Sequence, residues 1–90
     1  MAVVVTVEIP GGTAEMFRAV SEAAGAGAQQ PPGALFRAAG PIPGGWRVVS
    51  GWESAEAYMS FMRERLQPAW AQRGVQPSRI EVWPAEEIRA

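Results

Sequence analysis

Apolar residues fall into four short runs and two helical stripes along the 90-residue chain. The first run, residues 3–9, is rich in β-branched side chains and almost continuously apolar, which predicts a central strand covered on both faces. A Pro-Gly-Gly turn ends this strand, and Thr13 is placed to cap a helix. Apolar residues at positions i, i+3 and i+7 then predict a helix over residues 14–24.

The middle of the chain predicts a loop followed by a hairpin. Residues 25–33 contain only Gly, Ala, Gln and Pro, so they predict either a lid over a cavity or a plain connection. A short strand over residues 34–39 and an alternating strand over residues 46–53 flank a turn rich in Gly and Pro. One face of the second of these strands carries Trp46, Val48, Ser50 and Trp52.

The last third of the chain predicts a second helix and a fourth strand. Ser54 caps the helix, and apolar residues at helical spacing between positions 58 and 70 face the core. Pro68 has no backbone N–H, so we expect the helix to kink or restart there. Residues 78–83 alternate between apolar and polar side chains and predict the final strand.

The resulting β-α-β-β-α-β order predicts a ferredoxin-like α+β fold, with one domain over residues 1–90. Right-handed connections place both helices on one face of a four-stranded antiparallel sheet, with the first and third strands central and parallel to each other. The other face then has no cover within the chain. On that face we expect Val4, Thr6, Glu8, Arg47, Val49 and Glu53.

This uncovered face is too apolar to be exposed to water and too charged to form a hydrophobic core within one chain. Packing against the same face of a second copy satisfies both demands, because a twofold interface is self-complementary. The sequence therefore predicts a homodimer through the open face of the sheet.

The composition removes most familiar catalytic machinery. The chain has eight Arg and nine Glu, and it has no His, Cys, Asp, Asn or Lys. Ser-His-Asp triads, cysteine nucleophiles, Schiff-base lysines and His/Cys metal sites are therefore excluded, and we expect no metal and no cofactor.

The charge and hydropathy also argue against two classes of partner. A formal net charge of −1 leaves no basic excess for a nucleic acid. No apolar run approaches the ~20 residues of a membrane span, and the N-terminal residues lack the features of a signal peptide. The sequence predicts a cytoplasmic protein that binds neither nucleic acid nor membrane.

Several stretches resemble a known family. Residues 44–49, Gly-Gly-Trp-Arg-Val-Val, and residues 52–58, Trp-Glu-Ser-Ala-Glu-Ala-Tyr, are similar to a segment of small dimeric α/β-barrel proteins of the antibiotic-biosynthesis monooxygenase type. Residues 9–13, Ile-Pro-Gly-Gly-Thr, and residues 65–69, Arg-Leu-Gln-Pro-Ala, are similar to the same group. The resemblance implies a ferredoxin-like dimeric α/β barrel, a fold that carries unrelated activities.

That group includes cofactor-independent monooxygenases of polyketide aromatics and haem-degrading enzymes. The haem-degrading members use a histidine ligand, which this chain lacks. In small relatives a histidine often occupies the position of Arg37. The resemblance implies a protein that binds a small apolar or aromatic metabolite, as a cofactor-free oxygenase or cyclase. The alternative is a non-catalytic accessory or dimerisation module with no ligand site.

Six residues are candidates for a ligand pocket between the sheet and the helices. Aromatic side chains can stack on a flat ligand, and hydroxyl and guanidinium groups can anchor its polar atoms. The same aromatic side chains also fit a filled core, and the arginine fits a salt bridge or a position at the sheet edge. The candidates are Arg37, Trp46, Ser50, Trp52, Tyr58 and Phe61.

Glu8 and Glu53 are a separate, catalytic candidate. We expect them near the C-terminal ends of neighbouring parallel strands, where two close carboxylates raise one pKa and can act as acid and base. The alternative is that Glu53 simply precedes a helix N-terminus and that Arg47 of the partner subunit neutralises either carboxylate.

Overall fold

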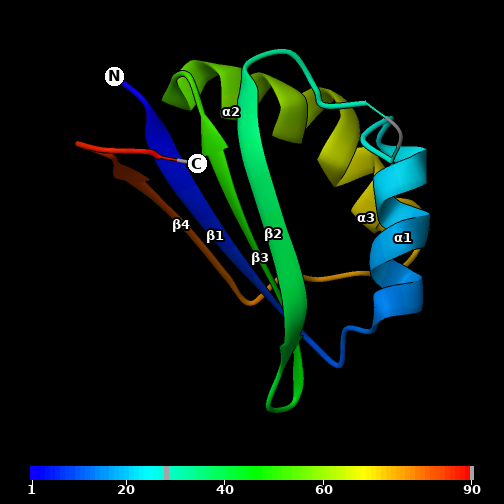
Figure 1. The fold of residues 1–90 in the computed structure, drawn as a ribbon. Helices are drawn as coiled ribbons and strands as arrows, with labels where there is room; N and C mark the ends of the chain where they lie inside the picture. Colours follow the sequence, from blue (N-terminus) through cyan, green and yellow to red (C-terminus); the bar gives the residue numbers. More distant parts are fainter. Residues whose placement is uncertain (28, 90) are drawn as a thin grey trace.

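The computed structural model describes residues 1–27 and 29–89, in which the helices cover one face of a single sheet (Figure 1). The expected β-α-β-β-α-β order is confirmed, and the strand order in the sheet is β2-β3-β1-β4. The strands are β1 (Val3–Pro10), β2 (Ala34–Ile42), β3 (Gly45–Trp52) and β4 (Arg79–Pro84). The helices are α1 (Ala14–Ala23), α2 (Ala55–Phe61) and α3 (Gln67–Gln72), with a π-helical turn η1 (Met62–Leu66) between the last two.

The two central strands, β1 and β3, run antiparallel, so the expected parallel pairing is wrong. The connection through α1 leaves β2 running in the same direction as β1, and the hairpin then reverses the chain, so β3 opposes both. The register pairs Glu8 with Arg47 and Val3 with Trp52. Glu53 therefore follows β3 at the end of the sheet opposite to Glu8.

The hairpin is longer than the sequence predicts. β2 extends through Pro41 to Ile42 rather than ending at residue 39. A proline is tolerated there because β2 is an edge strand and its missing N–H breaks no central ladder. A turn at Pro43 and Gly44 connects to β3, and the positive φ of 78° at Gly44 is one that glycine adopts without strain.

Both predicted helix caps are confirmed. The Thr13 hydroxyl accepts a hydrogen bond from the backbone N–H of Met16 at 3.1 Å. The Ser54 hydroxyl accepts one from the backbone N–H of Ala57 at 3.1 Å. Each cap satisfies a donor that would otherwise lack a partner in the first helical turn.

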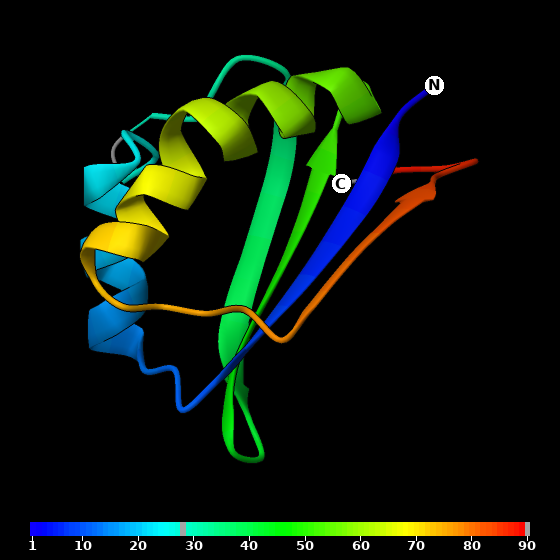
Figure 2. The same cartoon turned by 180° about the vertical axis from the view of Figure 1, so that it is seen from behind.

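Pro68 changes the hydrogen-bond register of the helix rather than ending it. The N–H of Gln67 donates to the carbonyl of Met62, five residues back, and Pro68, which has no N–H, follows directly. In Figure 2, α2, η1 and α3 form one bent helical rod across the sheet. Within the described part of the chain, no helix is long and apolar enough to cross a membrane.

The core lies between the helices and one face of the sheet. β1 contributes every second residue, because alternate side chains of a strand point to opposite faces. The described core cluster consists of Val3, Val5, Val7, Ile9, Val20, Ala24, Trp52, Tyr58, Ala69, Trp70 and Val75.

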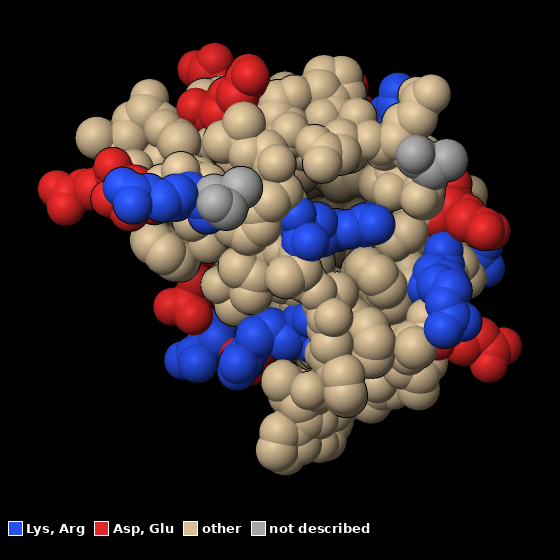
Figure 3. All heavy atoms as spheres, in the orientation of Figure 1, with Lys and Arg blue, Asp and Glu red and all other residues tan. Residues whose placement is uncertain are grey.

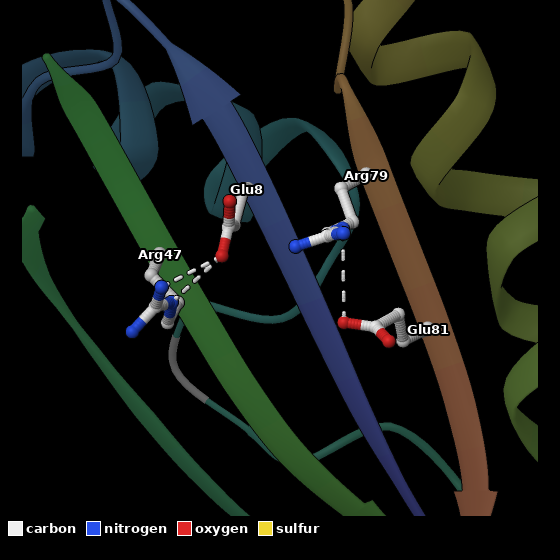
Figure 4. Close-up of polar contacts among 4 residues, drawn as sticks. All are labelled: Glu8, Arg47, Arg79 and Glu81. Carbon is white, nitrogen blue, oxygen red and sulfur yellow. Dashed lines mark hydrogen bonds and ion pairs between the residues drawn. The ribbon is translucent and has the colours of Figure 1, made fainter.

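The opposite face of the sheet, called the open face here, carries charged side chains from three neighbouring strands (Figure 4). Arg47 on β3 forms an ion pair with Glu8 on β1, with 2.7 Å between Nη2 and Oε2. Arg79 and Glu81 on β4 lie 3.9 Å apart on the same face. As expected from the sequence, this face also carries Val4, Thr6 and Val49.

The C-terminal segment covers one end of the open face, so the expectation that the chain leaves this face bare is wrong there. The segment turns back from β4 across β1 (Figure 1), and the N–H of Ala85 donates to the carbonyl of Ala2 at 2.9 Å. Ile88 lies over Gly51, where a Cβ atom would stand 3.3 Å from Ile88 Cδ1. Val4, the register partner of Gly51, is only 6% exposed.

Candidate functional site

A cavity of about 300 Å³ lies between the sheet and the helices. Its walls come from β1, β2 and β3 on one side and from α1, α2, η1 and α3 on the other, and most of the lining side chains are apolar. Figure 3 shows a hollow on this side of the molecule, with a basic side chain at its edge. Among the described lining residues, Arg37 is the only charged one.

One wall of the cavity is a contiguous aromatic cluster around Trp52. The ring centroid of Trp52 lies 5.5 Å from that of Tyr58, in an edge-on arrangement, and 5.3 Å from that of Phe61. The Trp52 Nε1–H donates to the hydroxyl of Ser50 at 2.8 Å, which fixes the orientation of the indole. The structure thus brings four of the six pocket candidates together on one wall.

The π turn determines which helical side chains reach this wall. Phe61 and Leu66 both line the cavity although they are five residues apart, one more than an α-helix places on the same face. The wider turn in η1 absorbs the extra residue. Tyr58, Phe61, Leu66 and Trp70 consequently form a single row along the cavity.

The hydroxyl of Tyr58 is the most constrained polar group in this wall. The residue is 2% exposed, and its oxygen has no hydrogen-bond partner among the described residues. Burial raises the pKa of Tyr58 to about 12, because the charged phenolate is disfavoured away from water. The hydroxyl therefore stays protonated near neutral pH and presents a hydrogen-bond donor that lacks an acceptor in the protein.

Arg37 lies at the edge of the sheet on β2, beside α1. Its Nη1 donates to the hydroxyl of Ser21 at 3.4 Å, and its Cζ lies 5.1 Å from the centroid of the Phe17 ring. The alternative of a salt bridge is not realised, since no carboxylate of the described residues lies within ion-pair distance of Arg37. Arg37 is a rim residue with a largely exposed side chain.

Phe17 and Ser21 line the cavity beside Arg37 and are not among the candidates that the sequence indicates. Phe17 belongs to the apolar stripe that predicts the first helix, and Ser21 follows that stripe by one position. The signal was available, because residues four apart share a helix face and Arg37 shares a strand face with its register partner Ser50. The sequence pattern does not show that α1 packs against β2.

Trp46 does not line the cavity, unlike the other five candidates. It packs against Phe17 with ring centroids 5.6 Å apart, next to Gly12, where a Cβ atom would lie 2.8 Å from Trp46 Cβ. Trp46 and Trp52 share a strand face, but six residues of strand separate them by about 20 Å. Its buried indole nitrogen has no partner among the described residues.

The expected pairing of Glu8 with Glu53 is wrong, because the antiparallel register places them at opposite ends of the sheet. Glu8 is held by Arg47 of the same chain. The backbone N–H of Glu53 donates to the carbonyl of Gly33 at 2.8 Å, directly before α2. Within residues 1–27 and 29–89, no group of three or more carboxylates is arranged to hold a metal ion.

The loop predicted over residues 25–33 borders the cavity. Ala26 and Gly27 line it before position 28, and Gln29, Gln30 and Pro31 line it afterwards. Position 28 itself lies outside the described residues. This placement is compatible with both interpretations of the loop, a lid and a plain connection.

No protein-family model matches this sequence, and no curated protein matches it significantly. Several solved structures do match its fold. A proposed antibiotic biosynthesis monooxygenase from Chloroflexus aurantiacus J-10-fl superimposes with a TM-score of 0.70 and 15% identity, over 100% of this chain and 98% of its own. SnoaB, a cofactor-independent oxygenase from Streptomyces nogalater, gives a TM-score of 0.65 and 15% identity, over 97% and 94% of the two chains.

A third structure, a proposed antibiotic biosynthesis monooxygenase from Deinococcus radiodurans, gives a TM-score of 0.66 and 17% identity over 100% of this chain and 97% of its own. At these identities the similarity concerns the fold. The chain has the ferredoxin-like fold of antibiotic biosynthesis monooxygenase structures, as the resemblance of its sequence implied.

Proposed function

We propose that this protein binds a small, flat, largely apolar metabolite in the cavity and oxidises it as a cofactor-independent oxygenase. The structural similarity to SnoaB, which is such an oxygenase, supports the reaction class. The lining of the cavity supports the class of ligand, because a wall of aromatic side chains with few polar groups suits a planar apolar molecule.

The observation that carries this proposal is the hydroxyl of Tyr58. A buried donor without an acceptor costs about 1–3 kcal/mol relative to a satisfied one. Tyr58 lines the cavity while its hydroxyl oxygen is covered by neighbouring atoms, so a ligand that displaces them on entry would supply the acceptor. The rings of Trp52 and Phe61 stand beside it and offer flat contact surfaces. A phenolic or enolic oxygen on an aromatic skeleton fits both features.

The chemistry requires a substrate that supplies its own electrons. Oxidation of a ring CH₂ group beside a phenol to a carbonyl consumes dioxygen and releases water, so no further reductant is needed. The substrate loses one CH proton to solvent and reacts with dioxygen as its enolate, and a proton returns when the resulting peroxide eliminates water to leave the carbonyl. The protein confines the enolate. Tyr58, which stays protonated because its pKa is about 12, donates a hydrogen bond to the anionic oxygen.

The proposal includes a homodimer formed through the open face. Trp83 on this face is 48% exposed, and Val49 lies on β3 opposite Thr6, two residues after Arg47. The Glu8–Arg47 ion pair balances its own charge within one chain, so two copies of the face meet without a net repulsion. Burial of the exposed tryptophan supplies the driving force.

Turnover of dithranol, a hydroxylated anthrone, tests the function. We expect the native protein to accelerate oxygen uptake and formation of the anthraquinone, and Tyr58→Phe to lower kcat/KM by about 100-fold, the usual cost of removing one donor to a developing oxyanion. Ser60→Ala is the matched control, because it removes a hydroxyl from the same helix at a position that does not line the cavity.

A lack of binding and turnover would contradict the proposal. If the native protein neither binds dithranol nor accelerates its oxidation above the rate in buffer, the oxygenase proposal is wrong. The non-catalytic accessory or dimerisation module would then be the better description.

A further inference from the structure

We propose, on the basis of the function proposed above, that the natural ligand is an aromatic carboxylate and that Arg37 binds its charged group at the rim of the cavity. The aromatic body would fill the apolar interior, with an acceptor oxygen at Tyr58. The carboxylate would remain at the surface. This assigns the substrate class and gives Arg37 a role in selecting it.

The position of Arg37 is the first support. A surface groove beside the cavity, called the outer groove here, is lined by residues of α1 and of the loop that follows it, together with Arg37. Five residues line both the cavity and the outer groove: Phe17, Ser21, Gly27, Gln29 and Arg37. Arg37 thus lies at the boundary through which the apolar interior meets solvent.

The charge balance around Arg37 is the second support. Arg47, Arg79 and Arg89 each form an ion pair with a glutamate. Arg37 forms none among the described residues, and it is the one charged residue of that part of the chain lining the cavity. The outer groove adds Arg18 and Glu22, whose charges offset each other. Arg18, Arg63, Arg65 and Arg73 also form no ion pair among the described residues, but none of them lines the cavity, so Arg37 supplies the one positive charge of the described lining.

The contacts of the guanidinium group are the third support. Arg37 Cζ lies 5.1 Å from the centroid of the Phe17 ring, in a cation–π contact, and a carboxylate binds guanidinium in the plane of the group. Nη1 donates to Ser21 Oγ at 3.4 Å, a long bond that is readily exchanged for a charged acceptor. The Nε and Nη2 donors have no acceptor among the described residues and can bind a carboxylate.

The rim position also suits the energetics of a charged ligand. Burying a carboxylate inside the apolar cavity would cost several kcal/mol of lost hydration. At the rim the carboxylate keeps part of its water and gains charge-assisted hydrogen bonds. The apolar body meanwhile leaves water completely, so one molecule satisfies both environments.

A matched pair of ligands tests the inference by calorimetric titration. 2-Naphthoate and 2-naphthamide have the same aromatic body and differ in charge at neutral pH. We expect the native protein to bind the carboxylate about tenfold more tightly than the amide. Arg37→Gln should bind the two compounds equally, and salt at about 1 M, which shortens the Debye length to about 3 Å, should weaken the native preference.

Arg18→Gln is the matched control, because it removes the same charge from the outer groove at a residue that does not line the cavity. It should keep the preference for the carboxylate. Equal binding of both compounds to the native protein, or an unchanged preference in Arg37→Gln, would overturn the role of Arg37 while leaving the proposed function intact. If neither compound binds the native protein, the inference about Arg37 fails, and dithranol turnover alone decides the proposed function.

Discussion

At the scale of single residues, Tyr58 and Ser50 show how similar hydroxyl groups in one wall come to differ. The Ser50 hydroxyl accepts a hydrogen bond from the indole N–H of Trp52, so it orients an aromatic ring and contributes to the fold. The Tyr58 hydroxyl has no partner among the described residues. Buried polar groups are normally satisfied within the protein, so the unsatisfied hydroxyl of a residue that lines the cavity supports the ligand site proposed above.

The raised pKa of Tyr58 predicts a loss of stability at alkaline pH. The unfolded chain ionises its tyrosine near the ordinary value of 10.0, whereas the folded protein holds the proton until about pH 12. The unfolded state therefore binds fewer protons between these values, and stability falls as pH rises through this window. We expect a loss of about 2 kcal/mol between pH 10 and pH 12.

Urea unfolding followed by tryptophan fluorescence measures this loss, and Tyr58→Phe should abolish it. A change in stability in this pH range can be attributed to Tyr58, because the chain contains one Tyr and no Cys or Lys that would titrate in the same range. A native protein that loses no more stability than Tyr58→Phe in this window would show that Tyr58 is not buried as described.

At the scale of the elements, the packing of β2 against β3 on the open face depends on glycine. Phe36 on β2 pairs in register with Gly51 on β3, and a Cβ atom at Gly51 would overlap the Phe36 ring. The absence of a side chain at Gly51 lets this ring and Ile88 lie flat on the sheet. Neither Gly51 nor Gly40, a glycine on the same face of β2, has a positive φ.

We predict that Gly51→Ala lowers the free energy of unfolding by about 1–3 kcal/mol through overpacking. Gly40→Ala is the control, because no atom lies within 4 Å of its added Cβ. Its effect should stay within about 0.5 kcal/mol. Urea midpoints of the two variants measure the difference, and equal midpoints would contradict the packing of Phe36 over Gly51.

At the scale of the whole molecule, the two faces of the sheet differ in how much of each is covered by other parts of the chain. One face is covered by the helices and contains the cavity, whereas the open face is covered only at the end where the C-terminal segment returns (Figure 1). The uncovered part of the open face carries Val49 and the Glu8–Arg47 pair, which Figure 4 shows, and the exposed Trp83 lies toward the covered end, paired with Val4. Apolar side chains beside internally neutralised charge are the basis for the proposed dimer.

We predict that the protein elutes at twice its chain mass of 9.6 kDa in size-exclusion chromatography with light scattering. Val49→Glu places a charge opposite its own copy in the proposed interface and should yield a folded monomer. Met59→Glu, which adds the same charge on the exposed side of α2, should remain dimeric. A native protein that elutes at 9.6 kDa would overturn the dimer.

Much of the fold could be predicted from the sequence because its signals are local. The β-branched run of β1, the caps at Thr13 and Ser54, and the stripe that contains Tyr58 and Phe61 reflect periodicity and capping chemistry within a few residues. The composition of the open face followed from the same alternation. The unexpected π turn has a local cause too, since Pro68 removes a donor, but several helical geometries satisfy that loss.

The helices and strands, the fold class and the residue types available for chemistry can be inferred from the sequence, because each depends on short-range patterns or on composition. Which side chains meet depends instead on how the elements pack in three dimensions. The antiparallel register separated Glu8 from Glu53, and the approach of α1 to β2 placed Ser21 beside Arg37. Whether aromatic side chains enclose a cavity depends on how far apart the packed layers stand, which no local pattern encodes.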